Sequence, residues 1–180
     1  MIARRGKLKA VSRAFVRETD GEQDEPPRPR PQLPPGLKNH ITPAGARRFQ
    51  TELDQLLERR GQLLRAEGVV PAERAEEKRE VEMRIRVLQQ ILDSVVVTAP
   101  PTMGRDRVCF GAELVVHNAR GEKEKYKIVG LDEAEPERGH ISWRSPLARA
   151  LLSHRAGDTI SFQTPSGPED LQILDVSYDD

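Results

Sequence analysis

The sequence has few cysteine and aromatic residues and no long apolar run. Of its 180 residues, seven are aromatic and one, Cys109, is a cysteine. A lone cysteine cannot form an internal disulfide, which favours a reducing, cytoplasmic setting. So few aromatic rings exclude the stacking surface that single-strand nucleic-acid binders use. Because no apolar run exceeds three residues, a membrane span and a secretory signal are also excluded.

Familiar catalytic motifs are missing as well. The chain contains no Walker A loop and no HExxH, CxxC or GxSxG pattern. Its four histidines lie apart without the spacing of metal ligands, so we expect no zinc site and no cofactor of its own. Cys109 stands beside Phe110 and is predicted to be a small buried hydrophobe rather than a nucleophile.

Charged residues are abundant, at 32% of the chain, and unevenly distributed. Residues 1–39 carry nine Lys and Arg against five Asp and Glu, a net +4, and residues 99–180 carry ten against fourteen, a net −4. The basic start is suited to contact nucleic acid or an acidic protein, or it serves only as a solubilising tail. Its stretch 18–36 holds six prolines and two glycines. This composition predicts a disordered arm over residues 1–38.

Two helices with heptad-like apolar spacing are predicted within residues 41–98. Thr42 is a good N-cap for a helix over 43–67, and the second helix starts near Pro71. The apolar stripes consist of Phe49, Leu53, Leu56 and Leu63 on the first helix and Val81, Ile85, Leu88 and Leu92 on the second. Joined by so short a turn, the helices are predicted to form an antiparallel coiled-coil hairpin. Such a hairpin serves for docking or pairs with a second copy, and we expect a monomer.

After Ala99-Pro100-Pro101 the apolar period changes from 3.6 to 2, which predicts a second domain over residues 103–180. One short helix is expected over 145–152, because Ser145 and Pro146 read as its cap and first residue. The strands of this domain are expected over residues 112–117, 126–131, 139–143, 158–164 and 171–178. We predict an antiparallel sheet with the helix on one face, so the fold class is α+β.

Several segments of the second domain resemble one family. They read Phe110-Gly111-Ala112, YKIVGLDE over 126–133, ISWRSPLARALL over 141–152, Gly157-Asp158 and TPSG over 164–167. In this combination they resemble the C-terminal domain of the Gre family of bacterial transcription elongation factors, and the GreB branch more than the GreA branch. The segment ITPAG over 41–45 is similar to the opening of the family's first helix.

The resemblance implies an FKBP-like fold for the C-terminal domain, which docks on bacterial RNA polymerase at the rim of its secondary channel. The hairpin then enters the channel, near the 3′ end of backtracked RNA. Acidic residues at its tip help to hold a Mg²⁺ ion of the polymerase, which cleaves the RNA, so the factor is not itself an enzyme. The implied polymerase contact includes Ser145, Pro146, Leu147 and Arg149, although Ser145 and Pro146 also read as a cap and Leu147 as core.

The turn between the two helices departs from the family pattern. It reads RAEGVVPAER over residues 65–74, without the Asp that family tips carry. The hairpin is also expected to be shorter by about one or two turns per arm, and each turn removes about 5.4 Å of reach. Glu67 and Glu73 are the acidic candidates at this turn, and the alternative is that they are only exposed helix-end charges.

Two other functions stay open at this point. The first is a regulator that occupies the polymerase channel without stimulating cleavage, because the turn lacks the usual acidic motif. The second is an FKBP-like peptide-binding module, which would need a deep aromatic pocket. The residues available to build such a pocket are Phe110, Tyr126, Trp143, Phe162 and Tyr178.

Overall fold

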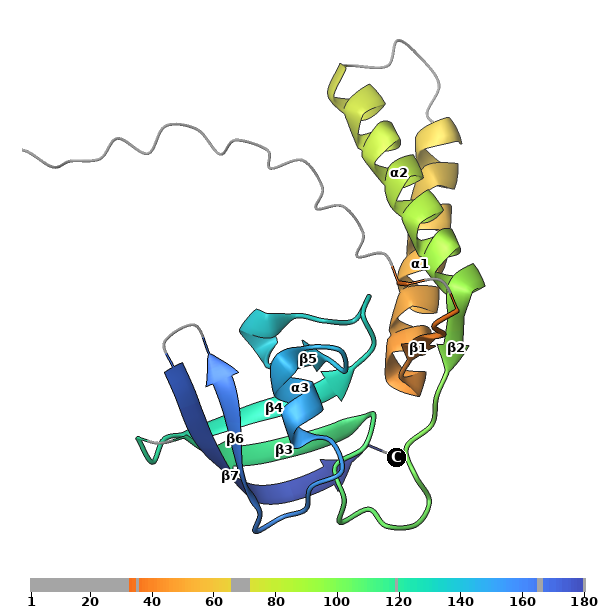
Figure 1. The fold of residues 1–180 in the computed structure, drawn as a ribbon. Coiled ribbons are helices and arrows are strands. Elements are labelled where there is room, and N and C mark those ends of the chain that lie inside the picture. Colours follow the sequence, from red (N-terminus) through yellow and green to blue (C-terminus); the bar gives the residue numbers. More distant parts are fainter. Residues whose placement is uncertain (1–32, 35, 66–71, 119, 165–166, 180) are drawn as a thin grey trace, which may run out of the picture. The chain divides into compact units, whose positions relative to one another are not determined.

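The computed structural model describes residues 33–34, 36–65, 72–118, 120–164 and 167–179. They include two long helices, a two-stranded sheet at their base and a five-stranded sheet with one short α-helix (Figure 1). Most of the predicted N-terminal arm, residues 1–32 and 35, lies outside them. No helix of the described stretches is long and apolar enough to cross a membrane.

The two long helices pack against each other along one apolar seam. Helix α1 spans Pro43–Arg65 and α2 spans Ala72–Ser94. The seam buries Ile41, Phe49, Leu53, Val81, Ile85, Leu88 and Ile91. Five of the eight predicted stripe residues are among them, whereas Leu56, Leu63 and Leu92 are only partly buried and Ile91 is buried in place of Leu92. The expected end of the first helix, at residues 66–67, lies outside the described part of the chain.

Ion pairs on the hairpin surface show that the helices are antiparallel. Glu52 of α1 accepts two hydrogen bonds from Arg84 of α2, one from Nε at 2.6 Å and one from Nη2 at 2.9 Å. Further along α1, Arg59 pairs with Glu77, which comes earlier in α2. These pairs are exposed, so each adds little to the free energy of unfolding. Together with the seam they set the register of the two helices.

The base of the hairpin contains two short strands that the sequence does not predict. Strand β1, Asn39–Ile41, pairs in parallel with β2, Val95–Val97. The prediction that the second helix continues to about residue 98 is therefore wrong, because α2 ends at Ser94. Valine side chains lose rotamer freedom in a helix and fit an extended strand better, so three in succession favour pairing with β1.

The C-terminal sheet has five strands in the order β5-β4-β3-β7-β6. Their bounds are Ala112–His117 for β3, Lys123–Val129 for β4, His140–Ser142 for β5, Thr159–Thr164 for β6 and Gly167–Tyr178 for β7. All neighbours are antiparallel except β4 and β5, so the expected wholly antiparallel sheet is wrong and the sheet is mixed. The connection through the short 3-10 helix η1, Pro136–Arg138, carries the chain back so that β5 runs in the direction of β4.

The core of this domain lies between the sheet and helix α3, Pro146–Leu151 (Figure 1). Ala148 and Leu151 of α3 are fully buried there. The strand residues buried with them are Leu114, Val116, Ile128, Ile160, Leu171 and Ile173. Alternate residues of β3 point into this core, as the period of 2 predicts. The fold class α+β is confirmed.

The two tyrosines of the chain hold hydrogen bonds within this domain. The Tyr178 hydroxyl accepts from the Cys109 N–H at 2.9 Å and donates to the Arg107 carbonyl at 2.5 Å. Burial raises the pKa of Tyr178 to about 12. Burial, followed by the hydrogen bond to Glu124, raises the pKa of Tyr126 as well. Cys109, predicted to be buried, is half-buried.

Truncation within the seam is expected to destabilise the hairpin. Leu88 is 0% exposed, and Leu88→Ala is expected to lower the free energy of unfolding by about 2–5 kcal/mol. Met83→Ala, on the same helix but at a 54% exposed position, is the matched control and is expected to cost less than about 0.5 kcal/mol. Urea unfolding followed by circular dichroism measures both. Equal effects would contradict the seam described here.

Alkaline titration is expected to show no tyrosine with an ordinary pKa. Tyr178 ionises near 12 in the folded chain and near 10 when unfolded, because burial disfavours the phenolate. The free energy of unfolding is therefore unaffected by this group below pH 10 and falls as the pH rises from about 10 through about 12. Phenolate absorbance of Tyr126→Phe isolates the Tyr178 signal. A midpoint near 10 in the folded variant would refute the half-buried, hydrogen-bonded position of Tyr178.

Candidate functional site

The acidic candidates of the hairpin turn are Glu67 and Glu73. Glu73 lies in the first turn of α2, where the helix dipole favours a negative charge, and its side chain is exposed. Within the described residues it has no hydrogen-bond or ion-pair partner. Glu67 lies outside the described residues.

The described residues contain no group of three or more His, Cys, Asp or Glu side chains that is placed to hold a metal ion. A hard divalent cation such as Mg²⁺ needs several oxygen ligands in near-octahedral geometry. Glu73 offers a single carboxylate. It is therefore suited to add one ligand to a metal site that another molecule holds, and it does not build a site by itself.

The second group of predicted residues surrounds the start of α3. Ser145 is the N-cap, since its hydroxyl accepts a hydrogen bond from the Ala148 N–H at 3.1 Å. Leu147 packs against the sheet core and is half-buried. The cap and core roles expected for these residues are therefore confirmed. Pro146 and Arg149 are exposed, and they are what this end of α3 offers to a partner.

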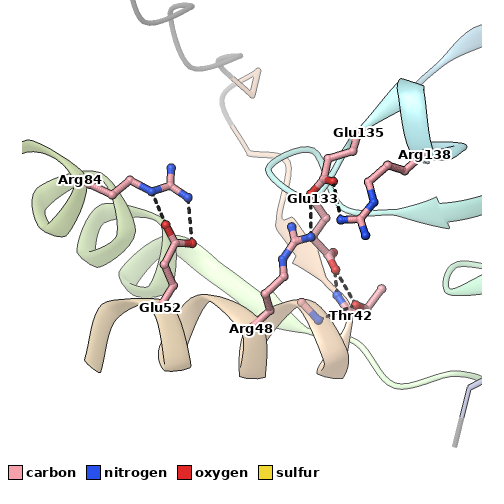
Figure 2. Close-up of polar contacts among 8 residues, drawn as sticks. Thr42, Arg48, Glu52, Arg84, Glu133, Glu135 and Arg138 are labelled. Carbon is pink, nitrogen blue, oxygen red and sulfur yellow. Dashed lines mark hydrogen bonds and ion pairs between the residues drawn. The ribbon is translucent and has the colours of Figure 1, made fainter. Parts of the chain in front are cut away.

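A third polar site joins the start of α1 to the loop that follows β4 (Figure 2). Its centre is the Glu133 carboxylate, which is 4% exposed. One carboxylate oxygen, Oε2, accepts from the Thr42 N–H and from the Gly130 N–H, both at 2.9 Å. The other, Oε1, accepts from the Thr42 hydroxyl at 2.5 Å. The same Thr42 oxygen accepts from the Gly45 N–H at 2.9 Å, which confirms Thr42 as the N-cap of α1.

Two glycines make this close approach possible. A Cβ at Gly45 would lie 1.9 Å from Glu133 Oε1, and a Cβ at Gly130 would lie 2.2 Å from the His40 carbonyl oxygen. Both distances are far below van der Waals contact, so any side chain at either position would push the carboxylate or the backbone away. The site therefore depends on glycine at both positions.

Two further contacts flank Glu133. Asn39 Nδ2 donates to Asp132 Oδ2 at 2.7 Å. Arg48 donates to Glu135 Oε1 at 2.6 Å, and Arg138 donates to the other oxygen of Glu135 at 3.2 Å. Burial acts to raise the pKa of Glu135, but the hydrogen bonds from Arg138 and Arg48 outweigh it and hold the pKa below its usual value.

An aromatic contact lies beside this polar site. The His40 ring of β1 meets the Trp143 ring edge to face, with 5.9 Å between ring centroids and an angle of 84°. The centroid of the His40 ring also lies 6.0 Å from that of the Phe110 ring. Its Nδ1 is 2.7 Å from the Thr98 hydroxyl oxygen. His40, just before α1, thus contacts one aromatic residue that precedes β3 and another that follows β5.

The Glu133 site is a functional candidate that reasoning from the sequence misses. Glu133 belongs to a segment that carries the family resemblance, but nothing in its spacing predicts a bond to Thr42, 91 residues away. The available signal is the pair Gly45 and Gly130. The first lies inside a helix and the second ends a strand, where glycine weakens structure unless another group must come close.

Comparison with known proteins identifies the family. The family described as "Transcription elongation factor, GreA/GreB, C-term" matches residues 103–178. A transcription elongation factor GreB of Neisseria meningitidis is 36% identical over 154 residues, which cover 78% of this chain and 94% of that relative. A transcription elongation factor GreA of Helicobacter pylori is 38% identical over 104 residues, covering 57% and 63%. Among solved structures, the GreA factor homolog Gfh1 of Thermus thermophilus is 24% identical, covers 78% and 99%, and has a TM-score of 0.37.

The relative from Neisseria is matched over almost its whole length, through both the hairpin and the C-terminal domain. The chain therefore belongs to the GreA/GreB family of transcription elongation factors. Within this family it is GreB-like, as its sequence motifs predict.

Proposed function

We propose that this chain is an elongation factor that binds bacterial RNA polymerase in the cytoplasm and acts on stalled or backtracked complexes. The observation that carries the proposal is the similarity to a GreB over 94% of that relative's length. A match of this extent includes the hairpin as well as the C-terminal domain. It therefore supports the function of a two-domain Gre factor and not merely a shared C-terminal domain.

In this proposal the C-terminal domain docks at the rim of the secondary channel. The exposed Pro146 and Arg149 at α3 form part of the contact, and Ser145 and Leu147 hold them in place from the cap and the core. Arg149 has no ion-pair partner among the described residues, so its guanidinium is available to an acidic group of the polymerase.

The hairpin then enters the channel as a monomer and brings its turn toward the polymerase's active centre. The Mg²⁺ ions there, held by the polymerase, supply the chemistry of RNA hydrolysis, in which two metals stabilise the attacking and leaving oxygens. Glu73 and Glu67, the two acidic residues of the sequence 65–74, are the carboxylates that this chain offers to that centre. The chain positions a ligand and does not itself cleave RNA.

One observation favours a second candidate function. The turn over residues 65–74 contains Glu67 and Glu73 but no Asp, unlike the acidic tips that the family resemblance implies. A hairpin whose carboxylates do not reach the metal would occupy the channel and modulate transcription without stimulating cleavage. The two functions share the docking step and differ only at the turn.

Docking is tested by measuring the affinity of the chain for purified RNA polymerase. Arg149→Ala is expected to weaken binding by about three- to tenfold, because it removes an exposed charge at the proposed contact. Arg120→Ala removes the same charge from an exposed position on the β3–β4 turn and is the matched control. If the folded wild type is not retained by polymerase at low salt, the proposed function is wrong.

Cleavage is tested on stalled complexes that carry end-labelled, backtracked RNA, with the factor at saturating concentration. Wild type is expected to shorten the RNA, and Glu73→Ala or Glu67→Ala to lose at least about tenfold of that rate while binding persists. Glu80→Ala changes an exposed carboxylate further along α2 and is the control. Binding without any shortening by the wild type would establish the channel-occupying regulator instead.

A further inference from the structure

The Glu133 carboxylate is buried, and its hydrogen-bond donors within the described residues are all neutral groups. It is 4% exposed and has no ion-pair partner among the described residues. Burial of an ionised carboxylate is costly unless hydrogen bonds compensate for the lost water. Three donors do so here, and two of them, the N–H and the hydroxyl of Thr42, belong to the start of the hairpin.

Three carboxylates of one short segment contact three residues at the base of the hairpin. Asp132, Glu133 and Glu135 bond to Asn39, Thr42 and Arg48 respectively. The Arg48–Glu135 pair is exposed on both sides and contributes little. The Glu133–Thr42 bonds are fully buried, and removing one partner of a buried pair leaves the other unsatisfied. The strength of this junction is therefore concentrated at Glu133.

We propose that Glu133 is a positioning residue, which holds the start of α1 on the C-terminal domain in the orientation that the factor needs to act on RNA polymerase. This inference rests on the proposed function, in which one domain docks and the other acts. The docked domain fixes the orientation of the hairpin through the connecting residues 98–111 and through the non-covalent contacts between the two parts. Glu133 supplies the most buried of these contacts.

The length of α1 sets how far a rotation at its base displaces the turn. Helix α1 has 23 residues, which corresponds to about 35 Å at 1.5 Å per residue. A rotation of about 10° at its base moves its far end by about 6 Å. A metal ligand at about 2.1 Å, or any close contact in a channel, does not tolerate such a displacement. A rotation of a few degrees about Thr42 is therefore enough to prevent the residues of the turn from acting on the polymerase.

Two substitutions at position 133 separate positioning from charge. Glu133→Gln keeps a carbonyl oxygen for the two N–H donors and can donate its amide to the Thr42 oxygen, so the junction is expected to survive. Glu133→Ala leaves the buried Thr42 and Gly130 donors without a partner. Thr42→Val, with Thr42→Ser as its control, removes the hydroxyl from the other side and provides a second route if Glu133→Ala does not fold.

The first measurement concerns the free chain. Spin labels are attached at Glu80→Cys on α2 and Ser161→Cys on β6, both exposed, in a Cys109→Ser background. Pulsed electron resonance is expected to give one narrow distance distribution for wild type and Glu133→Gln and a broad one for Glu133→Ala. A broad distribution in the wild type, or a narrow one in Glu133→Ala, would overturn the proposal.

The second measurement uses stalled polymerase complexes over a range of factor concentrations. For Glu133→Ala the maximum effect on the complex, RNA shortening or slowed extension, is expected to fall by roughly tenfold or more, while the half-saturating concentration changes by less than about threefold. Glu133→Gln is expected to restore the maximum. A loss of affinity with an unchanged maximum would refute positioning. If the wild type does not bind polymerase, the proposed function fails, and the distance measurement still decides whether Glu133 orients the hairpin.

Discussion

The hydroxyl group of Thr42 takes part in two hydrogen bonds on which both halves of the described chain depend. It accepts from the Gly45 N–H and donates to Glu133, so its proton and one lone pair are both used. The first bond starts α1, and the second attaches α1 to the loop after β4. A residue without a hydroxyl would lose the helix cap and the attachment together. The helix start and the junction are therefore specified by one side chain.

The described structure uses charge in two different ways. On the hairpin surface, Glu52–Arg84 and Arg59–Glu77 are solvated pairs that select a register without adding much stability. At the junction, the Glu133 charge is buried and faces neutral donors, where a partly satisfied arrangement would be worse than none. We therefore expect the site to form with all of its hydrogen bonds or not to form. Gly45 and Gly130 are necessary for these hydrogen bonds, because a Cβ at either position would displace the carboxylate or the backbone.

The parts of this fold that depend on local pattern could be predicted from the sequence. Phe49, Leu53, Ile85 and Leu88 recur at helical spacing, and Thr42 and Ser145 are caps in the structure as in the prediction. The parts that depend on distant partners could not. Val95–Val97 form a strand only because β1 is beside them, and β5 is parallel to β4 only because of the path between them. For the candidate site, the sequence predicts the helices that carry Glu73 and Arg149. It does not predict the hydrogen bonds between Thr42 and Glu133, because residues 91 positions apart produce no periodic pattern in the sequence.

The contact of Trp143 with His40 gives the junction an optical signal of its own. Trp143 is the single tryptophan of the chain, and its ring lies edge to face with an imidazole that belongs to β1, three residues after Leu37 and directly before the hairpin. The indole is half-buried in this position. All tryptophan emission of the molecule therefore originates where the hairpin meets the C-terminal domain. Because the ring also packs against the core of the C-terminal domain, its wavelength and its accessibility to quenchers respond to that contact and to the core beside it, in the unlabelled protein and in the presence of any tryptophan-free ligand.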